Sequence, residues 1–161
     1  MDTDSDGVTN DLDNCASTPV NATVDVNGCE ITSNNDFLLQ IQAEDFVASN
    51  GVQSGTMGGG IYGANYIGNG NWMTYSAVNI PTAGTYKLSY RVAGYGSGKL
   101  RLANGNTNLQ YSIFSFEAPE SWGNWITVTT TVNLPAGDIP FKITSKGDGI
   151  VSLSWFELEK I

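Results

Sequence analysis

The sequence contains no histidine, and it contains only two cysteines in 161 residues. The absence of histidine removes the commonest general base of enzymes and a common ligand of transition metals. No run of about twenty apolar residues is present, so no segment is expected to cross a membrane. We also find no amphipathic helical pattern longer than two turns, which argues against a helical fold.

Lysine and arginine are absent from the first half of the chain. Residues 1–86 contain ten aspartates and glutamates and no basic residue, whereas residues 87–161 contain six acidic and seven basic residues. A chain with a formal net charge of -9 repels phosphate backbones, which argues against a nucleic-acid partner. The hydrophobic content of 40% allows one domain with a core and a small appendage.

Both cysteines, Cys15 and Cys29, lie in the acidic N-terminal segment, fourteen residues apart. A cysteine pair in so short a segment is typical of a disulfide formed in an oxidising compartment. We therefore expect a secreted, extracellular protein. Two free thiols in a cytosolic linker are the alternative.

The segment "DTDSDGVTNDLDNC" places carboxylate and amide oxygens at short, regular intervals. This spacing lets one turn of chain direct several hard oxygen ligands at one point, as Ca²⁺ requires. It is not an EF-hand, because the twelfth position is an aspartate and no helical pattern flanks it. It resembles a thrombospondin type 3 repeat, and an acidic linker without metal is the alternative. The candidate ligands are Asp2, Asp4, Asp6, Asn10 and Asp13.

From residue 35 onward the chain consists of short apolar or alternating runs separated by turn residues. Runs such as "TYKLSYRVAG" and "IVSLSWFELE" are rich in β-branched and aromatic residues, which is typical of strands. Strands at this spacing without intervening helices predict an all-β fold, a β-sandwich or jelly roll of two antiparallel sheets.

The stretch "GVQSGTMGGGIYGANYIGNGNW" departs from this pattern, with eight glycines in 22 residues. We expect it to form a long loop over the sandwich, and long ordered loops often carry function. Tyr62 and Tyr66 lie within it and would be displayed to a flat ligand. A tyrosine that only anchors the loop through its hydroxyl is the alternative.

Four stretches occur in order along residues 37–161, namely "IQAEDF", "NYIGNGNWMTYSAVNI", "SWGNWITVTTTVNLPAG" and "GDGIVSLSWFELE". Together they resemble carbohydrate-binding module family 6. This resemblance implies a non-catalytic polysaccharide-binding module over residues 35–161, and that of the N-terminal segment implies an acidic, thrombospondin-like linker over residues 1–34.

The resemblance implies a binding site at the loop edge of the sandwich, with a sugar ring held between Tyr66 and Trp122. A pyranose suits this arrangement because the C–H bonds on its faces pack against aromatic rings. We expect Trp122 in the loop that contains proline and glycine, and Trp125 is then a structural residue of the following strand. Ser152 stands where the family has an asparagine, and Gly55 where it has a glutamate, so the usual contacts are altered. Polar residues that could replace them, unless they are ordinary solvated loop residues, are Asn65, Asp148 and, less directly, Gln53.

The resemblance also implies a structural calcium between the first and last strands. Gln42 and Glu44 occupy the first two ligand positions, and alternation along a strand would put both on one face. Ser154 stands at the third ligand position, so backbone oxygens there, or Glu157, would complete the site.

Some family members have a second cleft built on the tryptophan that is Trp72 here, but its carboxylate partner is replaced by Ala103. We therefore expect Trp72 to serve packing. A glycosidase using Glu117 and Glu120 is disfavoured, because no apolar surroundings would raise the pKa of one carboxyl.

An acidic calcium-binding spacer joined to such a module is similar to the architecture of secreted marine agarases. We expect binding of agarose, next to a covalently linked catalytic domain in the full-length protein. Xylan or β-1,3/1,4-glucan binding is the second interpretation, and a calcium-dependent structural or adhesive domain is the third.

Overall fold

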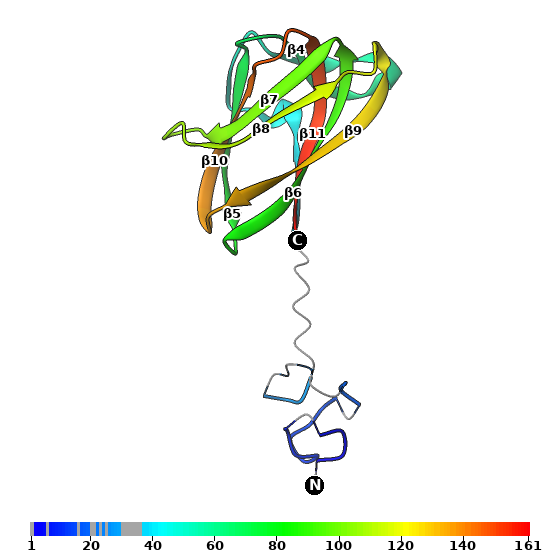
Figure 1. The fold of residues 1–161 in the computed structure, drawn as a ribbon, viewed down its shortest axis with the longest axis vertical. Coiled ribbons are helices and arrows are strands. Elements are labelled where there is room, and N and C mark those ends of the chain that lie inside the picture. Colours follow the sequence, from blue (N-terminus) through cyan, green and yellow to red (C-terminus); the bar gives the residue numbers. More distant parts are fainter. Residues whose placement is uncertain are drawn as a thin grey trace. The chain divides into compact units, whose positions relative to one another are not determined.

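The computed structural model describes residues 2–5, 7–15, 17–19, 22, 24, 26–29 and 37–161. The chain forms two compact units, Met1–Asn35 and Asp36–Ile161 (Figure 1). The sequence predicts this division one residue earlier, between residues 34 and 35.

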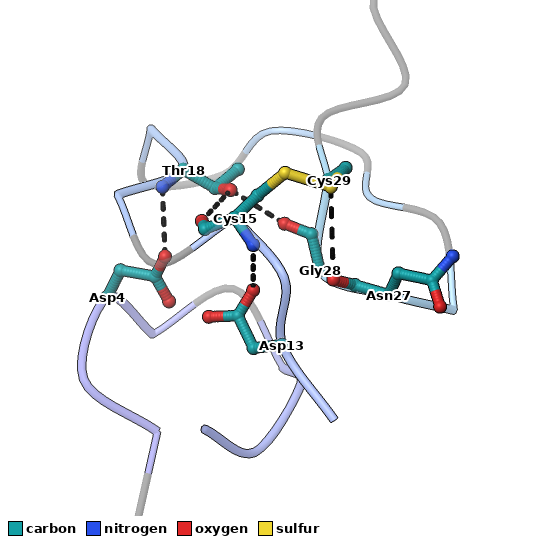
Figure 2. The surroundings of a disulfide bond; sticks show 7 residues. All are labelled: Asp4, Asp13, Cys15, Thr18, Asn27, Gly28 and Cys29. Atoms are coloured by element: carbon teal, nitrogen blue, oxygen red, sulfur yellow. Dashed lines mark hydrogen bonds between the residues drawn. A yellow bond between two sulfur atoms is a disulfide. The ribbon is translucent and has the colours of Figure 1, made fainter. Parts of the chain in front are cut away.

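The acidic N-terminal unit contains a disulfide between Cys15 and Cys29, which confirms the predicted bond. Figure 2 shows Thr18 beside it, with its hydroxyl 3.0 Å from the Cys15 carbonyl oxygen and 2.7 Å from that of Gly28. The Thr18 amide donates to Asp4 Oδ2 at 2.9 Å. One buried threonine therefore joins the disulfide loop to the aspartate-rich loop.

The second unit is an all-β sandwich of two antiparallel sheets, as the sequence predicts. One sheet has the strand order β3-β4-β11-β6-β9, with β1 also paired to β11, and the other has the order β2-β5-β10-β7-β8. Two short 3-10 turns, η1 (Ala43–Asp45) and η2 (Gly58–Gly60), precede β2 and β4. No helix in the described residues is long and apolar enough to cross a membrane. The strands are β1 (Leu38–Gln42), β2 (Ala48–Asn50), β3 (Gln53–Thr56), β4 (Tyr62–Ile67), β5 (Trp72–Ile80), β6 (Gly84–Tyr95), β7 (Ser97–Asn104), β8 (Gln110–Glu117), β9 (Ser121–Leu134), β10 (Gly137–Ser145) and β11 (Ile150–Lys160).

The core lies between the two sheets and is built by alternation along the strands. On β6, for example, Tyr86 and Tyr90 are fully buried, whereas Lys87 between them is partly exposed. Phe156 of the six-stranded sheet contacts Tyr75 and Phe141 of the other sheet, with ring centroids 5.0 and 6.2 Å apart. Burial of each such ring stabilises the fold by about 2 to 3 kcal/mol.

The glycine-rich stretch is not a loop, and this prediction from the sequence was wrong. It forms the hairpin of β3 and β4 on the edge of the six-stranded sheet, with η2 between the strands. A Cβ atom on Gly63 would lie only 2.4 Å from the Leu153 carbonyl oxygen, so glycine lets β4 approach β11 closely. Glycines that serve close packing hid the strand pattern, because glycine itself disfavours strands.

Candidate functional site

Four strands of the six-stranded sheet meet in one row at the end of the sandwich opposite the C-terminus (Figure 1). Their paired residues at this end are Ile67, Val151, Gly94 and Ser121, on β4, β11, β6 and β9. Next to each paired residue is a large side chain that is exposed or partly exposed. We call these four side chains the aromatic row, after the three of them that are aromatic; they are Tyr66, Ile150, Tyr95 and Trp122.

Tyr66 is displayed by an unusual backbone conformation. It is 59% exposed and has a φ of 62°, a left-handed value that costs a bulky residue on the order of 1 kcal/mol or more. Its carbonyl oxygen accepts hydrogen bonds from Gly68 N and Asn71 Nδ2, at 3.0 and 3.1 Å, which hold the conformation. The ring thus stays in solvent between two buried neighbours, Asn65 and Ile67.

The two tryptophans of β9 have different surroundings. Trp122 lies within β9, which begins at Ser121, and not in the preceding loop as predicted. The pairing with β6 is irregular here, because a two-residue step on β6 is matched by a five-residue step on β9. Such a bulge re-aims neighbouring side chains. Trp125 is buried and donates from Nε1 to the Gly58 carbonyl at 3.0 Å, whereas Trp122 stays partly exposed.

Tyr66 and Trp122 belong to strands separated by β11 and β6. Three spacings between strands put their backbones roughly 14 Å apart, which leaves room for a flat ring between two aromatic side chains. Trp122 packs edge-on against Tyr95, with ring centroids 5.3 Å apart. Sequence reasoning missed Tyr95, whose only signal is its place at a strand end before Gly96, a glycine with a φ of 77°.

Asn65 and Ser152, two of the predicted sugar partners, lie on adjacent strands and are buried. Asn65 donates from Nδ2 to the Gly55 carbonyl at 3.1 Å, while its Oδ1 has no hydrogen-bond partner in the described residues. The Ser152 hydroxyl is likewise unpartnered within the described chain, and the residue has no exposed surface. Neither oxygen is exposed to solvent, so a ligand would reach them only if neighbouring side chains moved.

The profile of the carbohydrate binding module (family 6) matches residues 42–160. The chain belongs to carbohydrate-binding module family 6. It is therefore a carbohydrate-binding module, and the family is non-catalytic and found attached to the catalytic domains of glycoside hydrolases.

Two solved structures of family 6 modules are similar to this one. The C-terminal module of LamC, a marine laminarinase from Zobellia galactanivorans, is 32% identical with a TM-score of 0.68, covering 77% of this chain and all of that chain. Module CBM6cm-2 of lichenase 5A from Cellvibrio mixtus, in complex with cellotriose, is 34% identical with a TM-score of 0.70, covering 76% of this chain and 97% of that chain.

Two curated proteins are similar over part of their length. The α-agarase of Alteromonas agarilytica is 31% identical over an alignment of 109 residues and covers 58% of this chain. The clotting factor G alpha subunit of Tachypleus tridentatus is 29% identical over an alignment of 125 residues and covers 75% of this chain. The matched part is only 7% and 18% of those two proteins, respectively.

Asp148 lies in the loop between β10 and β11, where it lines a pocket with Glu117. The Glu117 carboxylate accepts a hydrogen bond from the Ser97 hydroxyl, and Glu120 accepts one from the Gly96 amide at 2.7 Å. Both glutamates are exposed and bonded to different groups, so they do not form a catalytic pair of one buried acid and one base.

The predicted calcium ligands Gln42 and Glu44 do not alternate on one strand, because β1 ends at Gln42 and the chain turns into η1. Glu44 Oε2 is nevertheless buried without a hydrogen-bond partner in the described residues, which fits a cation. Ser154 lies where the pairing of β11 with β6 is shifted, so its backbone leaves the regular ladder. Glu157 instead accepts a hydrogen bond from Gln40 at 3.0 Å.

In the N-terminal unit several candidate calcium ligands accept hydrogen bonds from backbone amides of their own loop. Asp2 accepts the Ser5 and Gly7 amides, Asn10 the Thr3 amide, and Asp13 the Cys15 amide. Asp4 Oδ1 is buried and unpartnered within the described residues, which again fits a cation. Asp6 lies outside the described residues, and among those described no three acidic or cysteine side chains gather as a metal site.

Trp72 lies at the start of β5 on the outer face of the other sheet and is only partly buried. The Lys142 ammonium lies 4.6 Å from its ring centroid, a cation–π contact. Ala103 pairs with Lys142 on the neighbouring strand and supplies no carboxylate there.

Proposed function

We propose that this module binds agarose chains and holds a linked glycoside hydrolase at insoluble polysaccharide. One observation carries the proposal: the exposed, left-handed Tyr66 and the partly exposed Trp122 stand at the same end of the sandwich, on strands separated by two others. Agarose is favoured because a 31% identical relative is the α-agarase of Alteromonas agarilytica.

The sugar ring would lie between the two aromatic side chains, with its C–H faces against their π faces. Its hydroxyl groups lie in the ring plane and would be met by polar groups at the floor, where Asn65 Oδ1 and Ser152 Oγ lack partners among the described residues. Satisfying a buried, unpartnered oxygen removes a cost of about 1 to 3 kcal/mol, so these atoms favour a hydroxyl-rich ligand.

The chain enters the module far from this site. Leu38 at the start of β1 pairs with Glu159 near the C-terminus, whereas the aromatic row lies at the other end of β11. A catalytic domain tethered through the acidic segment would therefore leave the binding end open. Such tethering raises the effective concentration of enzyme at the polysaccharide without any new contact.

Binding of a β-1,3- or β-1,4-linked glucan is the second candidate. It is favoured by the two similar solved modules, which come from a laminarinase and a lichenase and are 32% and 34% identical. Ser152 and Gly55 stand where the family has an asparagine and a glutamate, so the contacts to the sugar hydroxyls differ from the family pattern.

We further propose that calcium binds beside Glu44 and in the loop of Asp4, with a structural role. The unpartnered carboxylate oxygen of each residue supports this proposal. Secretion is proposed with it, because the disulfide of the acidic unit is typical of oxidising compartments.

Pull-down of the whole chain on insoluble agarose, β-1,3-glucan and xylan tests the function and ranks the three sugars. We expect Tyr66→Ala to lower affinity for the bound polysaccharide by about 30-fold, the usual effect of removing an aromatic anchor. Tyr62→Ala is the matched control, because Tyr62 is also an exposed tyrosine of β4, at the strand's other end. Equal binding by both variants, or binding to none of the sugars, would remove the proposal and favour a structural or adhesive role.

A further inference from the structure

A pocket of about 270 Å³ opens where β7 begins, β8 ends and the β10–β11 loop passes. Its lining includes Ser97, Lys99, Glu117, Lys146 and Asp148. Small-molecule sites commonly measure about 300 to 1,000 Å³, so this pocket has the size for a single sugar residue.

Backbone contacts fix the walls of this pocket. The Lys146 amide donates to the Lys99 carbonyl at 2.8 Å, and the Gly149 amide donates to the Ser97 carbonyl at 2.9 Å. A Cβ atom on Gly147 would lie 2.4 Å from the Ser97 carbonyl oxygen, so only glycine lets the loop pass this close to β7. The pocket shape is therefore set by the fold before any ligand arrives.

The charged groups of the pocket are balanced, with two lysines and two carboxylates. Glu117 is held by the Ser97 hydroxyl, which lies 3.0 and 3.1 Å from its two oxygens. The side chains of Lys99, Lys146 and Asp148 are exposed and have no hydrogen bond or ion pair within the described part of the chain. They are thus available to a ligand.

This balance selects the class of ligand. An anionic group would meet two carboxylates, and a cationic group would meet two ammonium groups. A neutral polyhydroxylated ring can donate hydrogen bonds to the carboxylates and accept them from the lysines. A neutral sugar residue therefore fits the pocket better than a sulfated or carboxylated one.

The pocket adjoins the aromatic row through two chain segments. Ser97 follows Tyr95 by two residues on one segment, and Asp148 precedes Ile150 by two residues on the other. Tyr95 and Ile150 are themselves paired across β6 and β11. Two residues of chain span at most about 7 Å, and both connections bend here, so the pocket lies within the reach of neighbouring residues of one polysaccharide.

We propose that this pocket is a second sugar subsite, which binds the neutral residue adjacent to the one held by Tyr66 and Trp122. The inference rests on the proposed function, because it assigns the continuation of the same ligand. The subsite makes the module read two or more consecutive sugars, and longer oligosaccharides gain affinity through Glu117, Asp148 and the two lysines.

Calorimetric titration of the whole chain with neutral agaro-oligosaccharides and β-glucan oligosaccharides of two, four and six residues tests the subsite. We expect K146A/D148A, which keeps the net charge, to lose about tenfold in affinity for the longer ligands, the equivalent of one charge-assisted hydrogen bond. Affinity for the disaccharide stays within about twofold. The control K87A/E159A removes an exposed ion pair at the other end of the sandwich and leaves every affinity unchanged.

The outcomes separate the subsite from the binding site itself. If K146A/D148A keeps the full gain of affinity with length while Trp122→Ala weakens every ligand, the subsite is wrong and the aromatic site stands. If sulfated oligosaccharides bind more tightly than neutral ones and this preference disappears in K146A/D148A, the pocket takes anions and the inference is overturned. Failure of the wild-type chain to bind either series overturns the proposed function, and the subsite with it.

Discussion

Replacing the two tryptophans of β9 one at a time separates stability from binding. Trp125 is 7% exposed and its Nε1 donates to the Gly58 carbonyl. Truncating a buried tryptophan to alanine costs about 3 to 5 kcal/mol. The Gly58 carbonyl left without a donor adds about 1 kcal/mol. For a unit of this size 1 kcal/mol corresponds to roughly 3 to 5 °C in Tm, so we expect Trp125→Ala to lower Tm by at least about 10 °C.

Trp122→Ala should affect binding more than stability. The Trp122 ring packs edge-on against Tyr95, which contributes about 0.5 to 1.5 kcal/mol beyond the burial of its apolar surface. Because Trp122 is less buried than Trp125 and its indole N–H bonds no backbone carbonyl in the described residues, we expect the Tm to fall less than in Trp125→Ala. Affinity for the bound polysaccharide falls by about 30-fold or more, because truncating an aromatic anchor at a binding site commonly costs at least 2 kcal/mol.

Thermal unfolding followed by circular dichroism and affinity electrophoresis in polysaccharide gels measure the two effects on the same protein samples. Both experiments are done in calcium, so that metal loss does not confuse the comparison. The reasoning fails if Trp122→Ala binds like the wild type, or if Trp125→Ala leaves Tm unchanged and abolishes binding.

Three further changes follow from the buried polar groups. At a calcium concentration 100 times its Kd, metal binding would stabilise the wild type by about 2.7 kcal/mol relative to the protein in chelator. Thermal unfolding measures this difference, and we expect Glu44→Gln to remove it. If calcium has no effect on the wild type, the proposed site is refuted. Burial raises the pKa of the Tyr75 and Tyr90 hydroxyls, so above pH 10, where the unfolded state loses these protons first, unfolding free energy falls by about 1.4 kcal/mol per pH unit for each tyrosine. Urea titrations between pH 9 and 11 measure this slope, which should fall by half in Tyr90→Phe. At pH 7 Tyr90→Phe should cost little stability, because the Tyr90 hydroxyl has no partner in the described residues. Tyr75→Phe loses a 2.9 Å hydrogen bond to the Ala43 carbonyl and should cost about 1 to 3 kcal/mol. Equal stabilities of the two variants would contradict this.

The sequence predicts the sandwich because its strands alternate strongly. In "TYKLSYRVAG" the large buried side chains Tyr86, Leu88, Tyr90 and Val92 stand at every second position, and they fill the core between the sheets. The hairpin of β3 and β4 could not be predicted in this way. Gly63 is required by the close approach of β4 to β11, and Gly58 by the close approach of η2 to the backbone at Trp122; these tertiary contacts leave no periodic pattern in the sequence.

Parts of the candidate site could not be predicted for the same reason: they depend on tertiary contacts. Tyr66 and Trp122 could be named from the sequence because motifs surround them. Asp148 could be named as a polar candidate, but neither Tyr95 nor the pocket that Asp148 lines with Lys146 is marked by a local motif. Their roles depend on which strand ends meet, and the pairing of Ile150 with Tyr95 is a long-range contact. A residue's place at such a junction becomes visible only when the register of the sheet is known.

The strand β11 connects the proposed sugar-binding floor with the proposed calcium site, so we expect the two to depend on each other. Its pairing is shifted with β4 between Val151 and Leu153, and with β6 between Leu153 and Trp155. These irregularities break the alternation, so that four consecutive residues from Val151 to Ser154 are buried. Ser152, a proposed sugar partner, and Ser154 at the predicted metal position thus share one bulged segment, in which the backbone is less constrained by the ladder. Loss of calcium would therefore alter the position of Ser152 as well as stability, and oligosaccharide affinity should fall in Glu44→Gln even though Glu44 is assigned no sugar contact.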